Sequence, residues 1–252
     1  MRTLFLVIIF ALCACQSQPP PPERGSADPA VVMVRIINSD GDEGHCTGVV
    51  ISPHLVLTAA HCLARQTVGD HPDISLYLGG DASDPVRARR ASHRAAVAAT
   101  AYDPAFDVNR LAAGHDLGLV MTGAPLGVTP LSVNSAALGQ LGSARLVGYG
   151  IANPAAAESG NKGGVRRPLP VRIQAVSERF IELKDSEPRP CAGDSGGPIL
   201  ARLVEGGPEV VVGIISYGDS GCRREPLVTN LATYSSYLRD FLTRDSISAL
   251  RN

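Results

Sequence analysis

The sequence has no block of like charge, no apolar run long enough to cross a bilayer and no evident internal repeat. Its 252 residues carry a net charge of −1, so composition gives no indication of binding to nucleic acid or to a strongly acidic surface. The apolar run from Leu4 to Leu12 is too short to span a membrane as a mature helix. No metal-binding or nucleotide-binding motif is apparent, and we expect no cofactor. What remains is a chain long enough for one large domain or two small ones sharing a core.

The N-terminus has the features of an export signal. Arg2 precedes the apolar run, and the following Cys13-Ala14-Cys15 is similar to the lipobox of bacterial lipoproteins, in which a Cys after a small residue carries lipid. Cys15 fits that position, whereas Cys13 follows Leu12 and does not. The alternative is an ordinary cleaved signal peptide with an incidental Cys. We expect a signal peptide over 1–14 and a Pro-rich tether over 15–29. The protein would be exported, and either attached to the bacterial cell envelope through lipidated Cys15 or secreted.

The cysteines support an exported protein. Cys13 would leave with the signal peptide and Cys15 would carry lipid, which leaves an even number of the six. Disulfides form in oxidising compartments, so we expect the rest to pair, and their number alone allows three pairings. The remaining cysteines are Cys46, Cys62, Cys191 and Cys222.

Short apolar runs rich in β-branched residues alternate with turn residues after Ala30, in a chain that holds 26 glycines and 19 prolines. This pattern predicts many short strands in an all-β sandwich or barrel. The first set of expected strands is 31–37, 47–51, 55–58, 74–78 and 117–121. The second set is 144–149, 171–176, 180–183, 198–203, 210–216 and 228–233.

Four segments depart from the strand pattern. Residues 123–143 are rich in Gly, Pro and Ser and are expected to connect two halves. The apolar spacing after residue 234 predicts a C-terminal helix over about 234–250. Residues 88–101 fit a helix by their Ala content and a strand by their position. Residues 152–168 are expected to form an exposed loop that includes Arg166 and Arg167.

One Gly-rich segment carries the features of a catalytic nucleophile. A Ser hydroxyl is a weak nucleophile until a base takes its proton, and the oxygen that becomes negative on attack needs backbone N–H donors. Gly193-Asp194-Ser195-Gly196-Gly197 allows the tight bend and close approach that such a site requires. The alternative is a Gly-rich turn whose Ser bonds only its own backbone.

The order of residues along the chain selects among Ser-His-acid arrangements. All six His precede Ser195, so the α/β-hydrolase order, in which the His follows the Ser, is excluded. A subtilisin order would need Asp40 or Asp42, which lie in a Gly/Asp turn. His61, Asp116 and Ser195 give the remaining order, His then Asp then Ser.

These motifs together resemble the trypsin/chymotrypsin family of serine proteases, over about residues 30–242. Residues 46–52 and 55–62 resemble the hairpin that places the family's catalytic His beside a disulfide. Residues 213–218 resemble the strand that binds the substrate backbone beside the specificity pocket. The resemblance implies two packed six-stranded antiparallel β-barrels and a C-terminal helix. Within a protease domain of 30–252, barrel one would cover about 30–122 and barrel two about 144–233.

The resemblance also implies residue roles. Ser195 would attack the scissile carbonyl, His61 would be general base and then acid, and Asp116 would orient His61. The backbone N–H groups of Gly193 and Ser195 would form the oxyanion hole. The implied disulfides are Cys46–Cys62 and Cys191–Cys222. The implied specificity pocket comprises Arg189, Ser216, Tyr217, Gly218 and Leu227.

Two neighbouring features have competing interpretations. His115 lies next to Asp116, but strand alternation should point it away, so it is not expected to be the base. His45-Cys46 and His61-Cys62 contain zinc-ligand types. The exported setting favours a disulfide there, and we expect no metal.

The sequence departs from the family at two places. The residue six positions before the nucleophile is Arg189, not the Asp that selects Lys or Arg substrates. It would favour an acidic side chain before the cut, or turn to solvent and leave a shallow apolar pocket. The family's Ile-Val-Gly-Gly start, whose freed amine pairs with the acid before the Ser, is absent. Asp194 is that activation-linked acid. Either the chain is processed after a residue such as Arg24, or Asp194 has an internal partner, or the enzyme works without this switch.

The leading hypothesis is a serine endopeptidase that acts on protein or peptide substrates and is expected to be a monomer. A catalytically silent binding module of the same fold, or a zymogen, is the main alternative. An esterase using the same triad is a third, because acyl transfer is common to both reactions.

Overall fold

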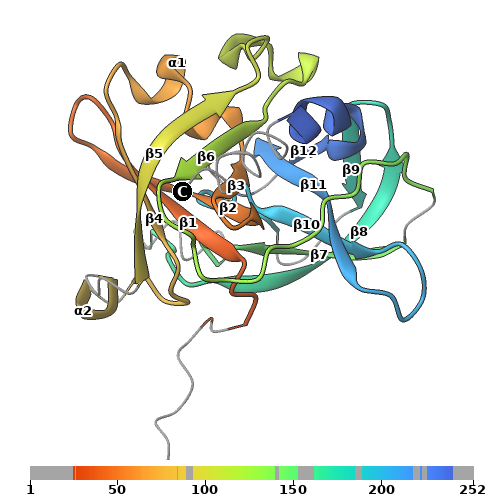
Figure 1. The fold of residues 1–252 in the computed structure, drawn as a ribbon. Coiled ribbons are helices and arrows are strands. Elements are labelled where there is room, and N and C mark those ends of the chain that lie inside the picture. The colour runs from red at the N-terminus through yellow and green to blue at the C-terminus, as the bar shows by residue number, and fades with distance from the viewer. Residues whose placement is uncertain are drawn as a thin grey trace, which may run out of the picture.

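A computed structural model describes residues 25, 27–83, 85–88, 93–139, 142–152, 162–184, 189–217, 222 and 226–240. In this part of the chain the strands form two closed, six-stranded antiparallel barrels that lie side by side (Figure 1). The predicted fold class is therefore confirmed.

Barrel one is built from the N-terminal half. Its strands are hydrogen-bonded in the closed order β1-β2-β3-β6-β5-β4. Their bounds are β1 Val31–Ile37, β2 Glu43–Ser52, β3 Leu55–Thr58, β4 Asp73–Tyr77, β5 Arg94–Tyr102 and β6 Gly118–Thr122. The helical turns of this half are η1 Ala60–Cys62, α1 Arg65–Val68, α2 Pro85–Ala88 and η3 Val108–Ala113.

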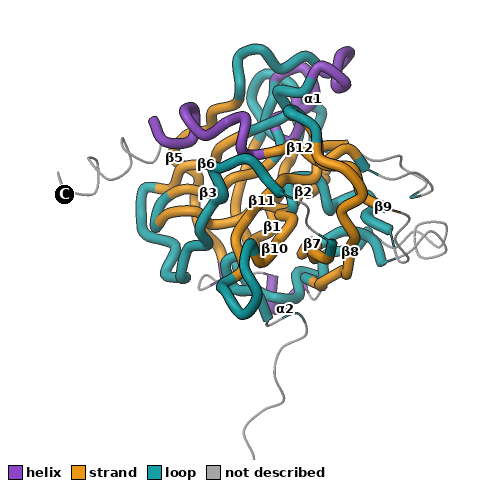
Figure 2. Tube along the Cα trace, turned by 90° about the vertical axis from the view of Figure 1, so that its right-hand side faces the viewer, coloured by secondary structure: helices purple, strands orange, loops and turns teal. Residues whose placement is uncertain are grey.

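Barrel two repeats this architecture in the order β10-β11-β12-β9-β8-β7. Its strands are β7 Ser143–Gly148, β8 Arg167–Val176, β9 Phe180–Lys184, β10 Pro198–Arg202, β11 Glu209–Tyr217 and β12 Leu227–Asn230. A 3₁₀ turn, η4 Leu231–Tyr234, then leads into a helix over 235–240. The tube in Figure 2 shows this helical end against the barrels. The rest of the predicted helix, 241–252, lies outside the described residues.

The ambiguous Ala-rich segment is a strand from Arg94 onward. β5 pairs with β4 through Ser75 and Ala96, and with β6 through Thr100 and Val120. Barrel closure gives its backbone hydrogen-bonding partners on both sides, which outweighs the helix propensity of alanine.

Each barrel has its own apolar interior, and a third cluster joins the two. Val34, Val50 and Val120 belong to the first interior, and Leu146 and Ile199 to the second. The joining cluster contains residues from both halves, among them Val31, Leu57, Tyr149, Leu200 and Ile214. The barrels therefore share a continuous core at their junction, which is where site residues from both can meet.

The chain passes from β6 of barrel one to β7 of barrel two between residues 122 and 143, as expected. Within this connection Val133 forms a parallel bridge with Val211 of β11. None of the helices in the described ranges is long and apolar enough to cross a membrane.

The folded part begins before Ala30, where the tether was expected to end. Arg145 of β7 forms a two-pronged ion pair with Asp28, at 2.6 and 2.8 Å, and also binds Glu209. Arg166 donates to the Gly25 carbonyl oxygen at 2.8 Å. The expectation that Arg166 and Arg167 lie in an exposed loop is wrong, because Arg166 is 4% exposed and Arg167 begins β8.

Candidate active site

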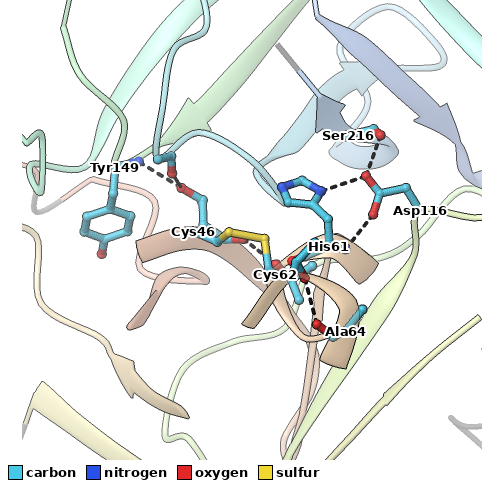
Figure 3. The surroundings of a disulfide bond; sticks show 11 residues. Cys46, His61, Cys62, Ala64, Asp116, Tyr149 and Ser216 are labelled. Atoms are coloured by element: carbon cyan, nitrogen blue, oxygen red, sulfur yellow. Dashed lines mark hydrogen bonds and ion pairs between the residues drawn. A yellow bond between two sulfur atoms is a disulfide. The ribbon is translucent and has the colours of Figure 1, made fainter. Parts of the chain in front are cut away.

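His61 lies in η1, the short turn that follows β3. The Cys46–Cys62 disulfide links β2 to this turn, with the two Cα atoms 6.3 Å apart. Fixing both ends of the hairpin restricts where the His61 ring can lie (Figure 3). This is the pairing that the family resemblance implies.

Asp116 is fully buried beside His61, just before β6. Its Oδ2 accepts a hydrogen bond from His61 Nδ1 at 2.8 Å, and its Oδ1 accepts one from the His61 backbone N–H, also at 2.8 Å (Figure 3). Burial alone would raise the pKa of Asp116, but the hydrogen bonds from His61 and Ser216 outweigh burial and lower the pKa. The carboxylate is thus ionised and can hold His61 with Nδ1 protonated and Nε2 free to accept a proton.

The Ser216 side chain lies at this carboxylate, and the expectation that Ser216 also borders the specificity pocket stays a prediction. Its hydroxyl donates to Asp116 Oδ2, and its side chain is buried (Figure 3). Ser216 belongs to β11, the expected strand, and because side chains alternate along a strand its hydroxyl is on the side that faces Asp116.

His115 binds a different acid, as expected for a residue that is not the base. Its Nδ1 lies 2.8 Å from Asp103 Oδ2, and its backbone N–H donates to Tyr234 Oη at 2.6 Å. Burial raises the pKa of Tyr234 to about 12, so its hydroxyl stays protonated at neutral pH. Through these contacts with Asp103 and Tyr234, His115 helps to fix the chain next to Asp116.

Ser195 lies in the loop that precedes β10. Its carbonyl oxygen accepts the Thr47 N–H of β2 at 2.7 Å, so barrel one holds the loop of barrel two. The next residue, Gly196, has φ of 78° and donates to the Ile215 carbonyl oxygen at 2.7 Å. Among the described residues, no hydrogen bond joins the Ser195 hydroxyl to His61, a contact that commonly tightens only when substrate binds.

Thr47 is a site residue that the sequence analysis missed. It is fully buried, and its hydroxyl donates to the Gly193 carbonyl oxygen at 2.7 Å while accepting the Tyr149 N–H at 3.0 Å. Together with its backbone bond to Ser195, this side chain fixes both residues expected to supply oxyanion donors. The only feature of the sequence that could have indicated this role is that Thr47 directly follows Cys46.

Position 193 requires a glycine, which has no side chain. Its φ of 93° lies in the left-handed region, and a Cβ there would collide with His45 Nε2. The same His45 Nε2 lies 3.1 Å from the Tyr149 carbonyl oxygen. Burial lowers the pKa of His45, although this carbonyl and nearby acids oppose the shift.

Asp194 points away from the candidate nucleophile into the protein, where it is fully buried. Its carboxylate accepts the Gly150 N–H at 2.8 Å, the Cys191 N–H at 3.0 Å and a guanidinium N–H of Arg167 at 3.0 Å. Burial raises the pKa of Asp194, and Arg167 and the two backbone N–H groups oppose that rise. Arg167 is a second residue at the candidate site whose contact the sequence analysis missed.

Pairing of Cys46 with Cys62 bears on whether these residues and His61 could bind zinc. Potential ligand atoms of Cys46, His61 and Cys62 lie within 4.8 Å of one another. Both sulfurs are joined in the disulfide, however, and so are not the thiolates that bind zinc. The second disulfide joins Cys191 to Cys222 beside the Ser195 loop.

Comparison with known proteins agrees with this geometry. A family model described as Trypsin matches residues 21–242. The chain belongs to the trypsin family. Granzyme M of Homo sapiens is 26% identical over 225 residues, covering 80% of each chain. A solved structure described as GrC has a TM-score of 0.69 at 18% identity, covers 87% of this chain and 96% of that one, and shares the fold.

Some of the residues expected to line a specificity pocket lie in the described part of the chain. Arg189 is half-buried just before Cys191, and Leu227 is half-buried where β12 pairs with Tyr217 of β11. Gly218 lies outside the described residues. The expected preference at this pocket therefore stays a prediction from the identity of Arg189.

Proposed function

We propose that this trypsin-family protein is a serine endopeptidase with His61, Asp116 and Ser195 as its triad. In this mechanism the Ser195 hydroxyl oxygen attacks the scissile carbonyl carbon while His61 Nε2 takes the hydroxyl proton. The negative oxygen of the tetrahedral intermediate accepts hydrogen bonds from the Gly193 and Ser195 N–H groups.

Collapse of that intermediate breaks the C–N bond. The His61 imidazolium gives its proton to the departing amine, which leaves an ester between the substrate acyl group and Ser195. Water then attacks the ester with His61 again as base, and the proton returns to Ser195 as the acid product leaves.

The observation that carries this proposal is the His61–Asp116 pair. A fully buried carboxylate with an N–H donor to each oxygen and a hydroxyl from Ser216 is positioned to stabilise an adjacent imidazolium. The position of Ser195 in a loop held by Thr47, on the same strand as Cys46, supports it further.

The first test is labelling of the purified full chain with a fluorophosphonate, which reacts with activated serines. We expect labelling of the wild type and none of Ser195→Ala or His61→Ala, with Ser143→Ala, an exposed residue of β7, as matched control. Labelling that persists in Ser195→Ala would refute the assignment of the nucleophile. Absence of labelling in every form would favour the silent binding module or a zymogen.

A second measurement separates an endopeptidase from an esterase. Matched peptide and ester substrates with the same acyl group are compared, and digests of an unfolded protein are analysed by mass spectrometry for internal cuts. Turnover of the ester with no cut in any peptide bond would contradict the endopeptidase proposal.

We also propose that the exported protein is anchored in a bacterial cell envelope through lipid on Cys15. The support is the small residue before Cys15 and the Pro-rich segment after it. Cys15→Ser should release the protein from the membrane fraction, whereas Cys13→Ser should leave it there. Equal release by both variants, or by neither, would contradict a lipid anchor at Cys15.

A further inference from the structure

A buried carboxylate next to the nucleophile has to be neutralised by its surroundings. Asp194 stands between Gly193 and Ser195, and its own backbone is part of the same turn, through Asp194 N–H to the Cys191 carbonyl oxygen at 2.9 Å. An uncompensated ionised carboxylate at full burial would be strongly unfavourable. Whatever balances its charge therefore also decides whether the Gly193–Ser195 turn is ordered.

Arg167 provides that charge from the first residue of β8. Besides its 3.0 Å ion pair with Asp194, its guanidinium donates to the carbonyl oxygens of Ile151 at 2.5 Å and Gly150 at 3.3 Å. Its side chain is only 19% exposed. The guanidinium is thus fixed by backbone groups independently of Asp194, as an organised partner should be.

The space around the carboxylate is closely fitted to this arrangement. A Cβ on Gly150 would lie 2.5 and 2.6 Å from the two carboxylate oxygens of Asp194, and one on Gly148 would also collide with it. His45 of β2 is the other titratable group near Asp194 in the described residues. Its pKa is lowered by burial, so it is neutral at neutral pH and supplies no opposite charge.

The N-terminal segment of the domain has anchors of its own. Arg166 holds the Gly25 carbonyl oxygen, and Arg145 holds the Asp28 carboxylate. Adjacent arginines thus have separate partners: Arg166 binds the incoming chain and Arg167 binds Asp194. At this end of the described chain, Gly25 and Asp28 are therefore held by groups other than Asp194.

We propose that Arg167 is a positioning residue that takes the place of the freed amino terminus of related proteases and orders the oxyanion turn without N-terminal cleavage. The inference rests on the proposed function. It implies that the enzyme is active as soon as it has folded and formed its disulfides, with the N-terminal tether still attached.

Two consequences distinguish this mechanism from activation by a free amine. An α-amino group has an ordinary pKa of about 8 and loses its charge in alkaline solution, whereas a guanidinium stays charged. Activity should therefore not decline between about pH 8 and 10, and chemical blocking of the amino terminus should have no effect.

The experiment uses the full chain and a fluorophosphonate. The labelled protein is isolated and its N-terminus identified by mass spectrometry. The rate of labelling is then measured before and after carbamylation of the amino terminus with cyanate, and from pH 7 to about 10. Arg167→Gln is compared with Arg167→Lys and with Arg172→Gln, an exposed residue of the same strand.

We expect the labelled chain to retain residues ahead of Gly25 and to be indifferent to cyanate. Arg167→Gln should lower the rate on the order of 100-fold, comparable to the loss of one oxyanion donor. Arg167→Lys should recover part of it, and Arg172→Gln should match the wild type. Labelling confined to chains cut ahead of the barrel, or equal rates for Arg167→Gln and Arg172→Gln, would overturn the inference and leave the proposed function intact. Failure of cut and uncut wild type alike to react would instead refute the proposed function, and this inference with it.

Discussion

The hydroxyl of Thr47 offers a sharp test of how the oxyanion turn is held. Thr47→Val keeps the shape of the side chain and the backbone N–H that binds Ser195, but it removes the hydroxyl that joins Tyr149 N–H to the Gly193 carbonyl. The buried Tyr149 N–H and the part-buried Gly193 carbonyl oxygen lose this partner. At about 1–3 kcal/mol for each unsatisfied group, the free energy of unfolding should fall by roughly 2–6 kcal/mol.

The effect on catalysis should come through Gly193. Without its tether the Gly193 N–H can move from the position where it meets the developing negative oxygen. Removal of one oxyanion donor costs about 10²–10³ in rate, so a displaced donor should cost on the order of 10- to 100-fold in kcat with little change in KM. Thr47→Ser keeps a hydroxyl and should recover most of the rate.

The assay is steady-state hydrolysis of an ester substrate, with urea unfolding of the same preparations. Thr122→Val is the matched control, because Thr122 is also buried and its hydroxyl donates to the Ala124 carbonyl oxygen at 2.8 Å, away from the site. It should lower stability and leave kcat unchanged. If Thr47→Val were destabilised as expected but kept its kcat within about twofold, Thr47 would be a purely structural residue and the reasoning would be wrong.

Three further outcomes follow from the same contacts. Ser216→Ala removes a hydrogen bond that lowers the pKa of Asp116, so the pKa of the Asp116 carboxyl, followed by carbon-13 NMR, should rise; an unmoved pKa would contradict this. Arg145→Gln should destabilise the fold by about 1–3 kcal/mol at pH 7 and by less at pH 3, measured by urea unfolding. The reason is that the Arg145 hydrogen bond lowers the pKa of Glu209 in the folded state. The ion pair therefore contributes its full stability above the unfolded-state pKa of about 4.3, and this contribution is lost as pH falls through the lower folded-state pKa. Equal losses of stability at both pH values would count against this explanation. Peptides with Lys or Arg before the cut should be the poorest substrates because of Arg189, and Arg189→Ala should improve them; a trypsin-like preference in the wild type would refute that role.

Much of the fold could be predicted because local pattern and chain order agree. The expected bounds of β1 and β3 match the structure, and the other expected strands overlap observed ones. Those segments are short, β-branched and bounded by turn residues, so burial and backbone propensity favour the same state. Residues 88–101 could not be assigned because their Ala content favours helix, and only pairing with β4 and β6 makes Arg94–Tyr102 a strand.

The candidate site was predictable where a motif names a residue and not where a contact joins segments that are distant in the sequence. His61, Asp116 and Ser195 stand in recognisable segments, and the structure brings the first two to 2.8 Å. Thr47 and Arg167 have no motif of their own. Their roles depend on which strand faces which loop in the folded chain. Thr47 and Gly193, for example, are more than a hundred residues apart in the sequence. No periodicity within one segment specifies such a contact.

The contacts that join the barrels are the same contacts that assemble the candidate site. Barrel one contributes His61 and Asp116, and barrel two contributes the Ser195 loop. Ser216 reaches from barrel two to Asp116, and Thr47 reaches from barrel one to the Ser195 loop. Each bridging group is buried, so separation of the barrels would leave polar groups unpaired on both sides. It would also remove the contacts that support the proposed triad. We therefore expect docking of the barrels and formation of the candidate site to be one cooperative event. The Arg167–Asp194 ion pair can order the Ser195 loop within that event, because its two members become neighbours only when barrel two is complete.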